Sequence, residues 1–277
     1  MILMDEIFNY IKEDLPYGDL SVNLQSNPKI KTKLEIYTRE DILVSGSEIS
    51  SKIGEILGLK ATVLVESKNF AKVGDKIVEL QGNYDDIHKA WKLSQVFLEY
   101  SSGISTYTYK MKKIAQSINP KCQILGTRKT FPFAKKVCLK ALSDGGGFIH
   151  RLNLSDSILF FDKHRIIYKD NNEFYREISK FKDLSDERKI VVETLNLNDA
   201  YKLMECGTEV ILLDKFSKQD VEKVLKFRDN YYKNIKIICA GGINLTNILD
   251  YANADAIVTS AMYQAKMADL GANIYKI

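Results

Sequence analysis

The spacing of apolar residues changes about a third of the way along the chain. Before residue 84, short stretches alternate apolar and polar side chains, as strands with one solvated face do. Helical spacing in Ile7–Leu15 and in Ser47–Leu57 predicts two helices among these strands. The four predicted strands are Leu34–Tyr37, Ile42–Gly46, Ala61–Val65 and Lys76–Leu80. Together these elements predict an antiparallel sheet with helices on one face.

From Tyr84 onward the pattern predicts a long helix and then alternating strands and helices. The helix reaches about Ile118, with a break expected near Ser101–Gly103. Beyond Pro120, short β-branched apolar runs are typical of parallel strands buried on both faces. The runs are Gln123–Leu125, Ser157–Phe160, Ile190–Val192, Val210–Leu213, Ile235–Cys239 and Ala256–Val258. Their number favours a (β/α) barrel, complete or incomplete, over an open sheet.

Composition and charge argue against a nucleic-acid partner and against insertion in a membrane. Of the 277 residues, 45% are hydrophobic and 27% are charged, which is ordinary for a globular protein. The formal net charge of +4 is too small to indicate a nucleic-acid partner. The chain has no run of about 18 apolar residues, and its acidic start at Asp5–Glu6 is unlike a signal peptide. We therefore expect a cytoplasmic protein that is not inserted in a membrane.

The cysteines predict buried thiols rather than a metal site. Cys122, Cys138, Cys206 and Cys239 are widely spaced in apolar surroundings and form no Cys-x-x-Cys pair. Zinc sites need clustered ligands, so we expect free thiols in a reducing compartment.

Polar and small residues collect where the predicted barrel strands end. Active sites of (β/α) barrels are built from the residues just after the carboxyl ends of the strands. Here those positions hold two cations, two carboxylates and two turns of small residues, and a histidine and a third cation lie just before the second predicted strand. They are Thr127, Arg128, Lys129, His150, Arg151, Glu193, Asp214, Ala240, Gly241, Gly242, Thr259 and Ser260. We expect them to share one rim.

The residue types on this rim indicate a phosphorylated sugar substrate. Arg128, Lys129 and Arg151 suit a highly anionic ligand. Glu193 and Asp214 are hard oxygen ligands, suited to Mg²⁺ bound to a diphosphate. The Gly241–Gly242 turn can direct backbone N–H groups at a phosphate. A sugar with a 5-phosphate and a Mg²⁺-bound diphosphate fits all three features, and its transfer needs no protein nucleophile.

Several motifs together resemble the nicotinate-nucleotide pyrophosphorylase (quinolinate phosphoribosyltransferase) family. In the second half they are Thr127-Arg128-Lys129-Thr130, Gly145-Gly146-Gly147 with His150-Arg151 and Leu154-Ser155-Asp156, Leu213-Asp214 and Gly241-Gly242-Ile243-Asn244. In the first half, Asp14 with Gly18-Asp19 and Ser102-Gly103-Ile104 are similar to the family pattern. The resemblance therefore extends over nearly the whole chain.

This resemblance implies a fold and an assembly. It implies an N-terminal α/β sandwich with an antiparallel sheet over residues 1–110 and an irregular TIM-like α/β barrel over residues 111–265. The tail 266–277 is free to rejoin the first domain. The resemblance also implies a homodimer with a shared active site, in which one subunit's N-terminal domain closes the barrel of the other.

The resemblance also implies an activity and roles for the rim residues. The activity is that of a glycosyltransferase (pentosyltransferase) that uses phosphoribosyl diphosphate as co-substrate and Mg²⁺ as cofactor. Lys129, Glu193 and Asp214 would be catalytic, and the two carboxylates would hold Mg²⁺ through the diphosphate. Thr127, Arg128, Lys129, His150 and Arg151 would bind substrate, and Ala240, Gly241, Gly242, Thr259 and Ser260 would bind the 5-phosphate.

Two departures from the family pattern affect the acceptor. Two substrate-binding cations of the quinolinate enzymes, an Arg and a Lys, are replaced here by Tyr100 and Phe161. Each lost ionic contact costs roughly 2–5 kcal/mol of affinity for a dicarboxylate. With Glu99 beside Tyr100, and with the run from Thr259 to Asp269, these positions look like the ModD branch of the family, which is associated with molybdenum transport genes. We expect Tyr100 and Phe161 to line the site of an acceptor that is flatter or less charged than quinolinate.

Other interpretations stay open at this point. The rim is compatible with a non-catalytic protein that binds a nucleotide or oxyanion in molybdate handling. It is also compatible with an authentic carboxylating nicotinate-nucleotide pyrophosphorylase. Lys215, next to Asp214, would serve as the Schiff-base lysine of an aldolase-like barrel. Glu193 and Asp214 also have a plainer interpretation, as polar residues that cap strand ends.

Overall fold

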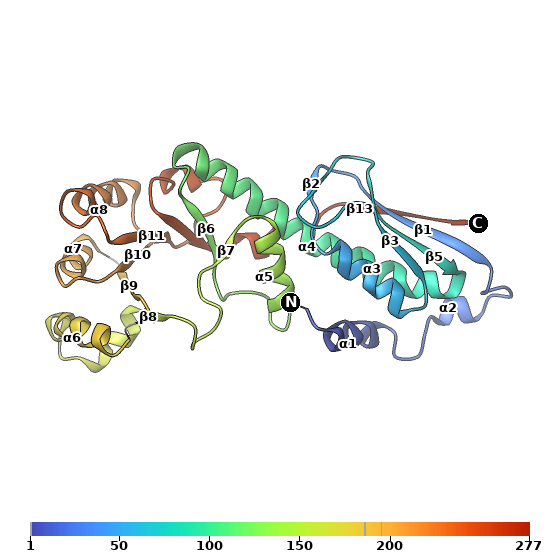
Figure 1. The fold of residues 1–277 in the computed structure, drawn as a ribbon, viewed down its shortest axis with the longest axis horizontal. Coiled ribbons are helices and arrows are strands. Elements are labelled where there is room, and N and C mark those ends of the chain that lie inside the picture. The colour runs from blue at the N-terminus through green and yellow to red at the C-terminus, as the bar shows by residue number, and fades with distance from the viewer. Residues whose placement is uncertain (1, 186, 195) are drawn as a thin grey trace. The chain divides into compact units, whose positions relative to one another are not determined.

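The computed structural model describes residues 2–185, 187–194 and 196–277, which form two compact units (Figure 1). The first unit comprises Met1–Tyr109, Thr130–Gly146 and Met262–Ile277. The second comprises Lys110–Lys129 and Gly147–Ala261. The expected boundary near residue 110 therefore falls within the long helix, and two later segments, 130–146 and 262–277, return to the first unit.

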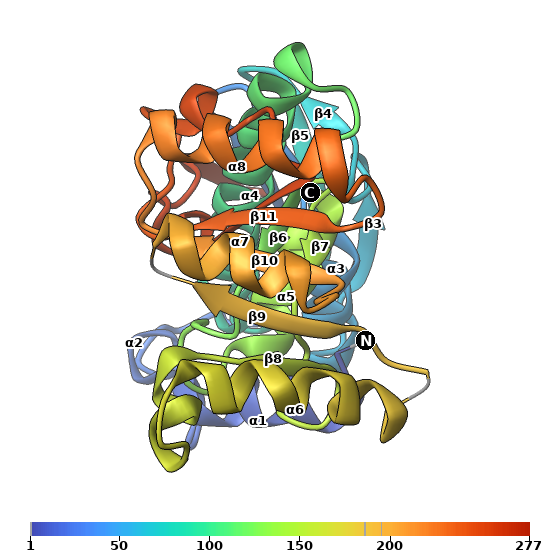
Figure 2. The same ribbon diagram turned by 90° about the vertical axis from the view of Figure 1, so that its left-hand side faces the viewer.

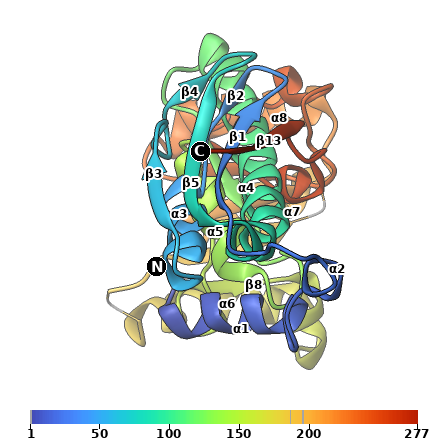
Figure 3. The same ribbon diagram turned by 90° about the vertical axis from the view of Figure 1, so that its right-hand side faces the viewer.

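The first unit is built on a four-stranded antiparallel sheet in the order β13-β1-β5-β3 (Figure 3). The strands are β1 (Lys31–Thr38), β3 (Lys60–Val63), β5 (Lys76–Asn83) and β13 (Leu270–Lys276). The tail therefore contributes an edge strand, paired with β1. The predicted strand at residues 42–46 is shorter than expected. Only β2 (Ile42–Leu43) is extended, and it pairs with β4 (Phe70–Ala71) in a separate ribbon.

Helices α3 (Ser47–Ile56) and the first part of α4 (Tyr84–Ile118) pack against this sheet. The first unit also contains α1 (Met4–Asp14), α2 (Leu20–Asn23) and α5 (Lys135–Asp144). Leu34, Ile36 and Leu80 of the sheet pack in one core with Ile87 and Leu98 of α4. A second cluster joins α1 and α3 to α4. The helix-on-sheet architecture predicted from the sequence is confirmed.

The predicted break in α4 is wrong, because the helix is continuous from Tyr84 to Ile118. The hydroxyl of Ser101 donates to the carbonyl of Phe97, one turn back, at 2.6 Å, and so it is satisfied within the helix. Gly103 serves close packing instead, since a Cβ there would lie 2.5 Å from the carbonyl oxygen of Lys266. The small residues thus permit a close contact and no bend.

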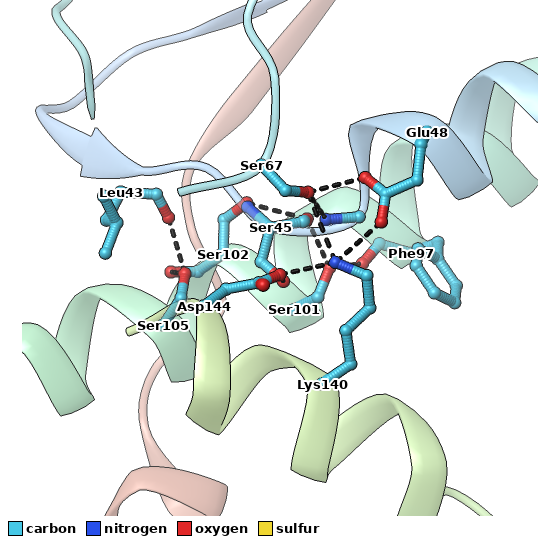
Figure 4. Close-up of polar contacts among 11 residues, drawn as sticks. Leu43, Ser45, Glu48, Ser67, Phe97, Ser101, Ser102, Ser105, Lys140 and Asp144 are labelled. Carbon is cyan, nitrogen blue, oxygen red and sulfur yellow. Dashed lines mark hydrogen bonds and ion pairs between the residues drawn. The ribbon is translucent and has the colours of Figure 1, made fainter. Parts of the chain in front are cut away.

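A partly buried polar cluster connects α5 to other segments of the first unit (Figure 4). Lys140 of α5 forms ion pairs with Asp144 and with Glu48 of α3. Ser45 donates to Asp144 at 2.7 Å, and Ser67 donates to Glu48 at 2.6 Å. Because both carboxylates have partners, the cluster is satisfied internally, and we interpret it as structural.

The second unit is built on a seven-stranded parallel sheet in the order β7-β6-β12-β11-β10-β9-β8 (Figure 2). The strands are β6 (Gln123–Gly126), β7 (Phe148–Ile149), β8 (Ile158–Phe160), β9 (Ile190–Thr194), β10 (Val210–Asp214), β11 (Lys236–Ala240) and β12 (Ala256–Thr259). Six of these strands were predicted. The two-residue β7 was missed. The curled sheet is an incomplete barrel, with β7 and β8 as its edges.

Helices α6 (Asn171–Asp183), α7 (Leu197–Glu205) and α8 (Lys218–Tyr231) lie on the outer side of this sheet (Figure 2). Short 3₁₀ helices η1 (Asp162–Ile167), η2 (Ile248–Asp250) and η3 (Ala261–Gln264) complete the connections. The side chains of Asn196 and Ser217 accept hydrogen bonds from backbone N–H groups at the starts of α7 and α8. These caps begin each helix directly after a strand.

The two faces of the parallel sheet bury different residues. On the inner face one cluster contains Leu125, Leu159, Val191, Val210, Leu212, Ile238, Ala240, Ala256 and Val258. Residues between them, such as Val192 and Ile211, are fully buried on the opposite face. This alternation, with a period of two residues, decides which side chains reach the inner side where the strands end.

The described residues contain no helix that is long and apolar enough to cross a membrane. The four cysteines are free, and three of them are buried. Burial raises the pKa of Cys239 to about 12, so this thiol is inert at neutral pH.

Candidate active site

The strand ends of the second unit lie level with one another. Glu193 of β9 is paired with Leu212 of β10, and Asp214 is paired with Ala240 of β11. At the other side of the sheet, the ladder continues one residue beyond β6, because Thr127 N donates to the carbonyl of Thr259 at 3.2 Å. Since all seven strands are parallel, their carboxyl ends lie along the same side of the sheet, which we call the carboxyl edge, and the residues at these ends share it.

The alternation of the strands brings the two predicted carboxylates to the inner face. Glu193 follows Val191 of the inner cluster by two residues, and Asp214 follows Leu212 in the same way. Phe161 likewise follows Leu159, and it packs against the inner cluster. These side chains therefore continue the inner surface beyond the apolar cluster, to the polar residues at the ends of the strands.

The pKa of Glu193 depends on the other charges of the rim. Glu193 is half-buried, and burial raises its pKa, with the nearby charge of Asp214 raising it further. Lys129 and Arg165 act in the opposite direction, from the same neighbourhood. Two carboxylates that repel each other favour a bound cation. The described residues contain no group of three or more His, Cys, Asp or Glu side chains that could hold a metal alone. A carboxylate pair does fit Mg²⁺, which keeps waters and shares its ligands with substrate phosphates.

The cations of the rim also lie close enough to repel each other. Arg128 and Lys129 are exposed on the turn after β6, where the hydroxyl of Thr127 accepts a hydrogen bond from Lys129 N at 3.0 Å. Burial lowers the pKa of Arg151, and the charge of Arg128 lowers it further. Burial and Arg151 also lower the pKa of His150, which favours the neutral imidazole. A polyanionic ligand would relieve this repulsion.

The turn after β11 passes tightly beside the carboxylate of Asp214. Gly241 and Gly242 have φ angles of +93° and +74°, which favour glycine. A Cβ on Gly241 would lie 2.8 Å from Oδ1 of Asp214. Thr259 is buried, and its hydroxyl donates to the carbonyl of Ile243 at 2.6 Å, which holds the turn in place. Ser260 is half-buried at the end of β12.

Tyr100 belongs to the first unit, unlike the other predicted site residues. Its Oη forms a 3.4 Å hydrogen bond with Sγ of Cys138, and its ring contacts Phe131. Burial and the contact with Cys138 raise the pKa of its hydroxyl. Within the second unit, the structure brings together the remaining predicted positions from Thr127 to Ser260, with Phe161 beside them.

Sequence reasoning missed a residue that fixes the position of Glu193. Arg165 of η1 is buried, and it donates from Nη2 to the backbone carbonyl of Glu193 at 2.8 Å. From Nη1 it donates to Asp199 at 2.8 Å, and Tyr175 donates to the same carboxylate at 2.6 Å. The sequence signal was weak, since Arg165 lies in a charged segment that resembles a solvated loop.

A cavity beside the rim was also missed. It has a volume of about 500 Å³ and is lined by Asn196, Leu197, Asn198, Lys215, Phe216, Ser217 and Asp220. These residues follow β9 and β10, so the cavity opens at the same edge of the sheet as the candidate site. The helix caps Asn196 and Ser217, each directly after a predicted strand, were the available signal.

Comparisons with known proteins agree along the whole chain. Residues 19–102 match the family model for the quinolinate phosphoribosyl transferase N-terminal domain, and residues 104–272 match the model for the C-terminal domain. A Pasteurella multocida protein named as the pyrophosphorylase ModD is 31% identical over 98% of this chain and 97% of its own length. A Methanocaldococcus jannaschii protein named as a carboxylating nicotinate-nucleotide pyrophosphorylase is 30% identical over 99% of both chains.

Solved structures show the same fold. The nicotinate-nucleotide pyrophosphorylase from Francisella tularensis superposes with a TM-score of 0.88 at 25% identity, covering 99% of this chain and 98% of the other. NadC from Streptococcus pyogenes gives a TM-score of 0.88 at 20% identity, covering 99% and 96%. The predicted α/β class, with an antiparallel sheet and an incomplete parallel barrel, is confirmed.

We expect Glu193→Gln to stabilise the ligand-free protein. A carboxyl whose pKa is raised in the folded state binds its proton more tightly there than in the unfolded chain. Its ionisation therefore opposes folding increasingly as pH rises through the folded-state pKa. The variant should melt about 1–3 °C above the wild type near pH 7, and this difference should vanish near pH 4.

Thermal unfolding without divalent cations measures this effect. Glu187→Gln, at an exposed position of the same unit, is the control and should leave the melting temperature unchanged at both pH values. A Glu193→Gln protein less stable than the wild type near pH 7 would contradict the electrostatic picture of the rim.

Proposed function

The chain belongs to the quinolinate phosphoribosyl transferase family, and we propose that it transfers the phosphoribosyl group of phosphoribosyl diphosphate to an acceptor other than quinolinate. Membership makes it an enzyme of the pentosyltransferase type. The observation that carries the proposal is the gathering of Lys129, Glu193 and Asp214 at one edge of the sheet, where the charges of the lysine and the aspartate alter the pKa of Glu193. That edge suits a substrate that carries both a metal ion and a diphosphate.

The residues of the rim divide the work of this reaction. Arg128 and Arg151 bind the diphosphate, because its negative charge offsets the repulsion between the two guanidinium groups. Glu193 and Asp214 would hold Mg²⁺, which would supply the positive charge that neutralises the leaving diphosphate. The bond between C1 of ribose and the diphosphate oxygen breaks with its electron pair on the oxygen, and a lone pair of the acceptor forms the new bond to C1. The carboxylates also stabilise the positive charge that develops on the sugar.

Phe161 supports an acceptor with less charge than a dicarboxylate. Its ring packs on the inner cluster and lies over the ring of His164, with centroids 5.5 Å apart and an interplanar angle of 17°. A flat apolar surface at this place favours an aromatic ring over a second carboxylate. Authentic carboxylating activity is the second candidate, favoured by the 30% identity to the Methanocaldococcus jannaschii protein of that name.

Incomplete closure of the barrel supports the homodimer as part of this proposal. Edge strand β7 exposes Phe148 and Ile149, and η1, directly after edge strand β8, exposes Ile166 and Ile167 to 82% and 81%. Apolar side chains at both edges of one sheet favour burial against another protein surface. In this dimer the first unit of one subunit, which carries Tyr100, would close the site of the other.

We expect phosphoribosyl diphosphate with Mg²⁺ to raise the melting temperature by mass action. At about 100 times its Kd the ligand stabilises by about 2.7 kcal/mol, which corresponds to about 5–10 °C. Asp214→Asn should remove most of this shift and lower the rate of diphosphate release at least ~100-fold, because it removes one metal-binding carboxylate. Thermal shift and a diphosphate-release assay measure both effects.

Asp229→Asn, at an exposed position of α8, is the matched control and should behave as the wild type. Absence of any stabilisation by phosphoribosyl diphosphate would defeat the proposed function. Stabilisation without diphosphate release, over a panel of aromatic acceptors, nucleobases and molybdate, would favour a binding protein instead.

Acceptor choice is tested by restoring the two cations. Tyr100→Arg combined with Phe161→Lys should raise kcat/KM for quinolinate at least ~10-fold, because each cation pairs with a substrate carboxylate. The measurement is formation of nicotinate mononucleotide. Leu184→Lys, which adds a cation at an exposed position after α6, is the control. Robust formation of nicotinate mononucleotide by the wild type would establish the carboxylating enzyme and contradict our proposal.

For the dimer, we expect sedimentation velocity at micromolar concentration to give twice the mass of one chain. Ile166→Asp combined with Ile167→Asp should shift the protein to monomers, because two charges would be buried in the interface. Leu184→Asp, at a position exposed to 77% after α6, is the control and should stay dimeric. A monomeric wild type would reject this part of the proposal.

A further inference from the structure

Lys215 has a strained backbone at the centre of the candidate site. It directly follows Asp214 and has a φ of 59°, in the left-handed region. Only Lys68 and Phe133 share this feature among the non-glycine residues that the structure describes. In this conformation the Cβ approaches the following carbonyl, which costs free energy. Strain of this kind is concentrated at sites of function.

The strained backbone directs the side chain across the phosphate turn. Lys215 N donates to the carbonyl of Ala240 at 3.0 Å, which ties the residue to the end of β11. A Cβ on Gly241 would lie 2.5 Å from Cγ of Lys215. The aliphatic stem of Lys215 therefore occupies the space that a side chain at position 241 would need, beside the glycine turn.

The two segments that carry the predicted 5-phosphate residues contain no cation of their own. Neither the segment 240–247 after β11 nor the segment 259–264 after β12 contains Lys or Arg. A sugar phosphate held there by backbone N–H groups alone would keep most of its negative charge. Among the described residues, none forms an ion pair with Lys215, so its charge is available to a ligand.

The cavity beside the rim gives the ligand room. Its 500 Å³ is within the range of small-molecule sites. Besides Lys215, its lining carries the amides of Asn196 and Asn198, the hydroxyl of Ser217 and the carboxylate of Asp220. Asp220 is engaged by Lys223 and Ser217. Lys215 is therefore the one charged residue of this lining that has no ion-pair partner among the described residues. The amide groups of Asn196 and Asn198 and the hydroxyl of Ser217 suit hydrogen bonds to sugar hydroxyls.

We infer that Lys215 is the cation that binds the 5-phosphate of the sugar substrate at the Gly241–Gly242 turn, with the adjoining cavity taking the sugar-phosphate end. This inference rests on the proposed function and names a subsite within it. Lys215 binds through its ammonium group and forms no covalent intermediate. Arg128 and Arg151, which follow β6 and β7, serve the diphosphate.

The test compares two fragments of the substrate on the full-length protein. Lys215→Asn removes the charge but keeps the backbone, because asparagine tolerates the left-handed region better than lysine does. Titration calorimetry should show ribose 5-phosphate binding weakened about 10–100-fold, while binding of inorganic diphosphate with Mg²⁺ changes less than about threefold. The ligand-free melting temperature should equal or exceed that of the wild type, since strain is relieved.

Lys215→Arg should retain binding of ribose 5-phosphate, and Lys215→Gly provides a second charge-free variant should the asparagine protein fold poorly. Lys218→Asn is the matched control. This lysine is three residues away, exposed and paired with Asp250, so its loss should affect neither ligand.

Each outcome decides the inference. Unchanged binding of ribose 5-phosphate in Lys215→Asn, equal loss of both ligands, or a wild type that binds diphosphate but no ribose 5-phosphate would overturn it and leave the proposed function standing. A wild type that binds neither phosphoribosyl diphosphate nor inorganic diphosphate would defeat the proposed function itself.

Discussion

The second unit depends on one constraint, the parallel direction of its seven strands. Parallel pairing places every carboxyl end at the same edge, and the period of two residues then selects the side chains that face inward there. Glu193, Asp214 and Phe161 come from three strands, yet each lies two residues beyond a member of the same apolar cluster. The site is therefore a continuation of the core, and its geometry follows from the packing of that core.

Like charges at this edge oppose folding, and the ligand would relieve them. Glu193 and Asp214 form one repelling pair, and Arg128 and Arg151 form another. A bound metal ion would reduce the repulsion between the two carboxylates, and a bound diphosphate would reduce the repulsion between the two arginines. One metal-diphosphate group would therefore reduce both. Arg165 fixes the backbone of Glu193, because its buried guanidinium donates a hydrogen bond to the carbonyl of that residue. Sites prepared for a charged transition state commonly carry such a cost in stability.

The sequence predicted features that local pattern determines and missed those that depend on distant partners. Apolar runs identified six of seven parallel strands, but two-residue β7 is too short to show a pattern. Ser101–Gly103 suggested a break, whereas Gly103 serves contact with Lys266, far away in the chain. The rim residues after the six predicted strands could be predicted from that position, whereas His150 and Arg151 were identified from their motif. Arg165 could not be predicted, since it acts through a buried pair with Asp199. Lys215 was identified only as a Schiff-base candidate, since its backbone angle is set by the folded turn.

Under the proposed function, the strand order separates the residues that would recognise the two substrates. Phe161 follows β8, and the Gly241–Gly242 turn with Lys215 lies at the ends of β11 and β10. Between β8 and β11 lie two strands, so Phe161 and the Gly241–Gly242 turn are roughly 14 Å apart along the sheet at about 4.8 Å per strand, and Phe161 and Lys215 are roughly 10 Å apart. Residues at such separations contribute nearly independently to binding energy. Under the proposed function, a change from cationic to aromatic residues at the acceptor pocket would leave the phosphate turn undisturbed. A site for a phosphorylated sugar would in this way accompany a different acceptor.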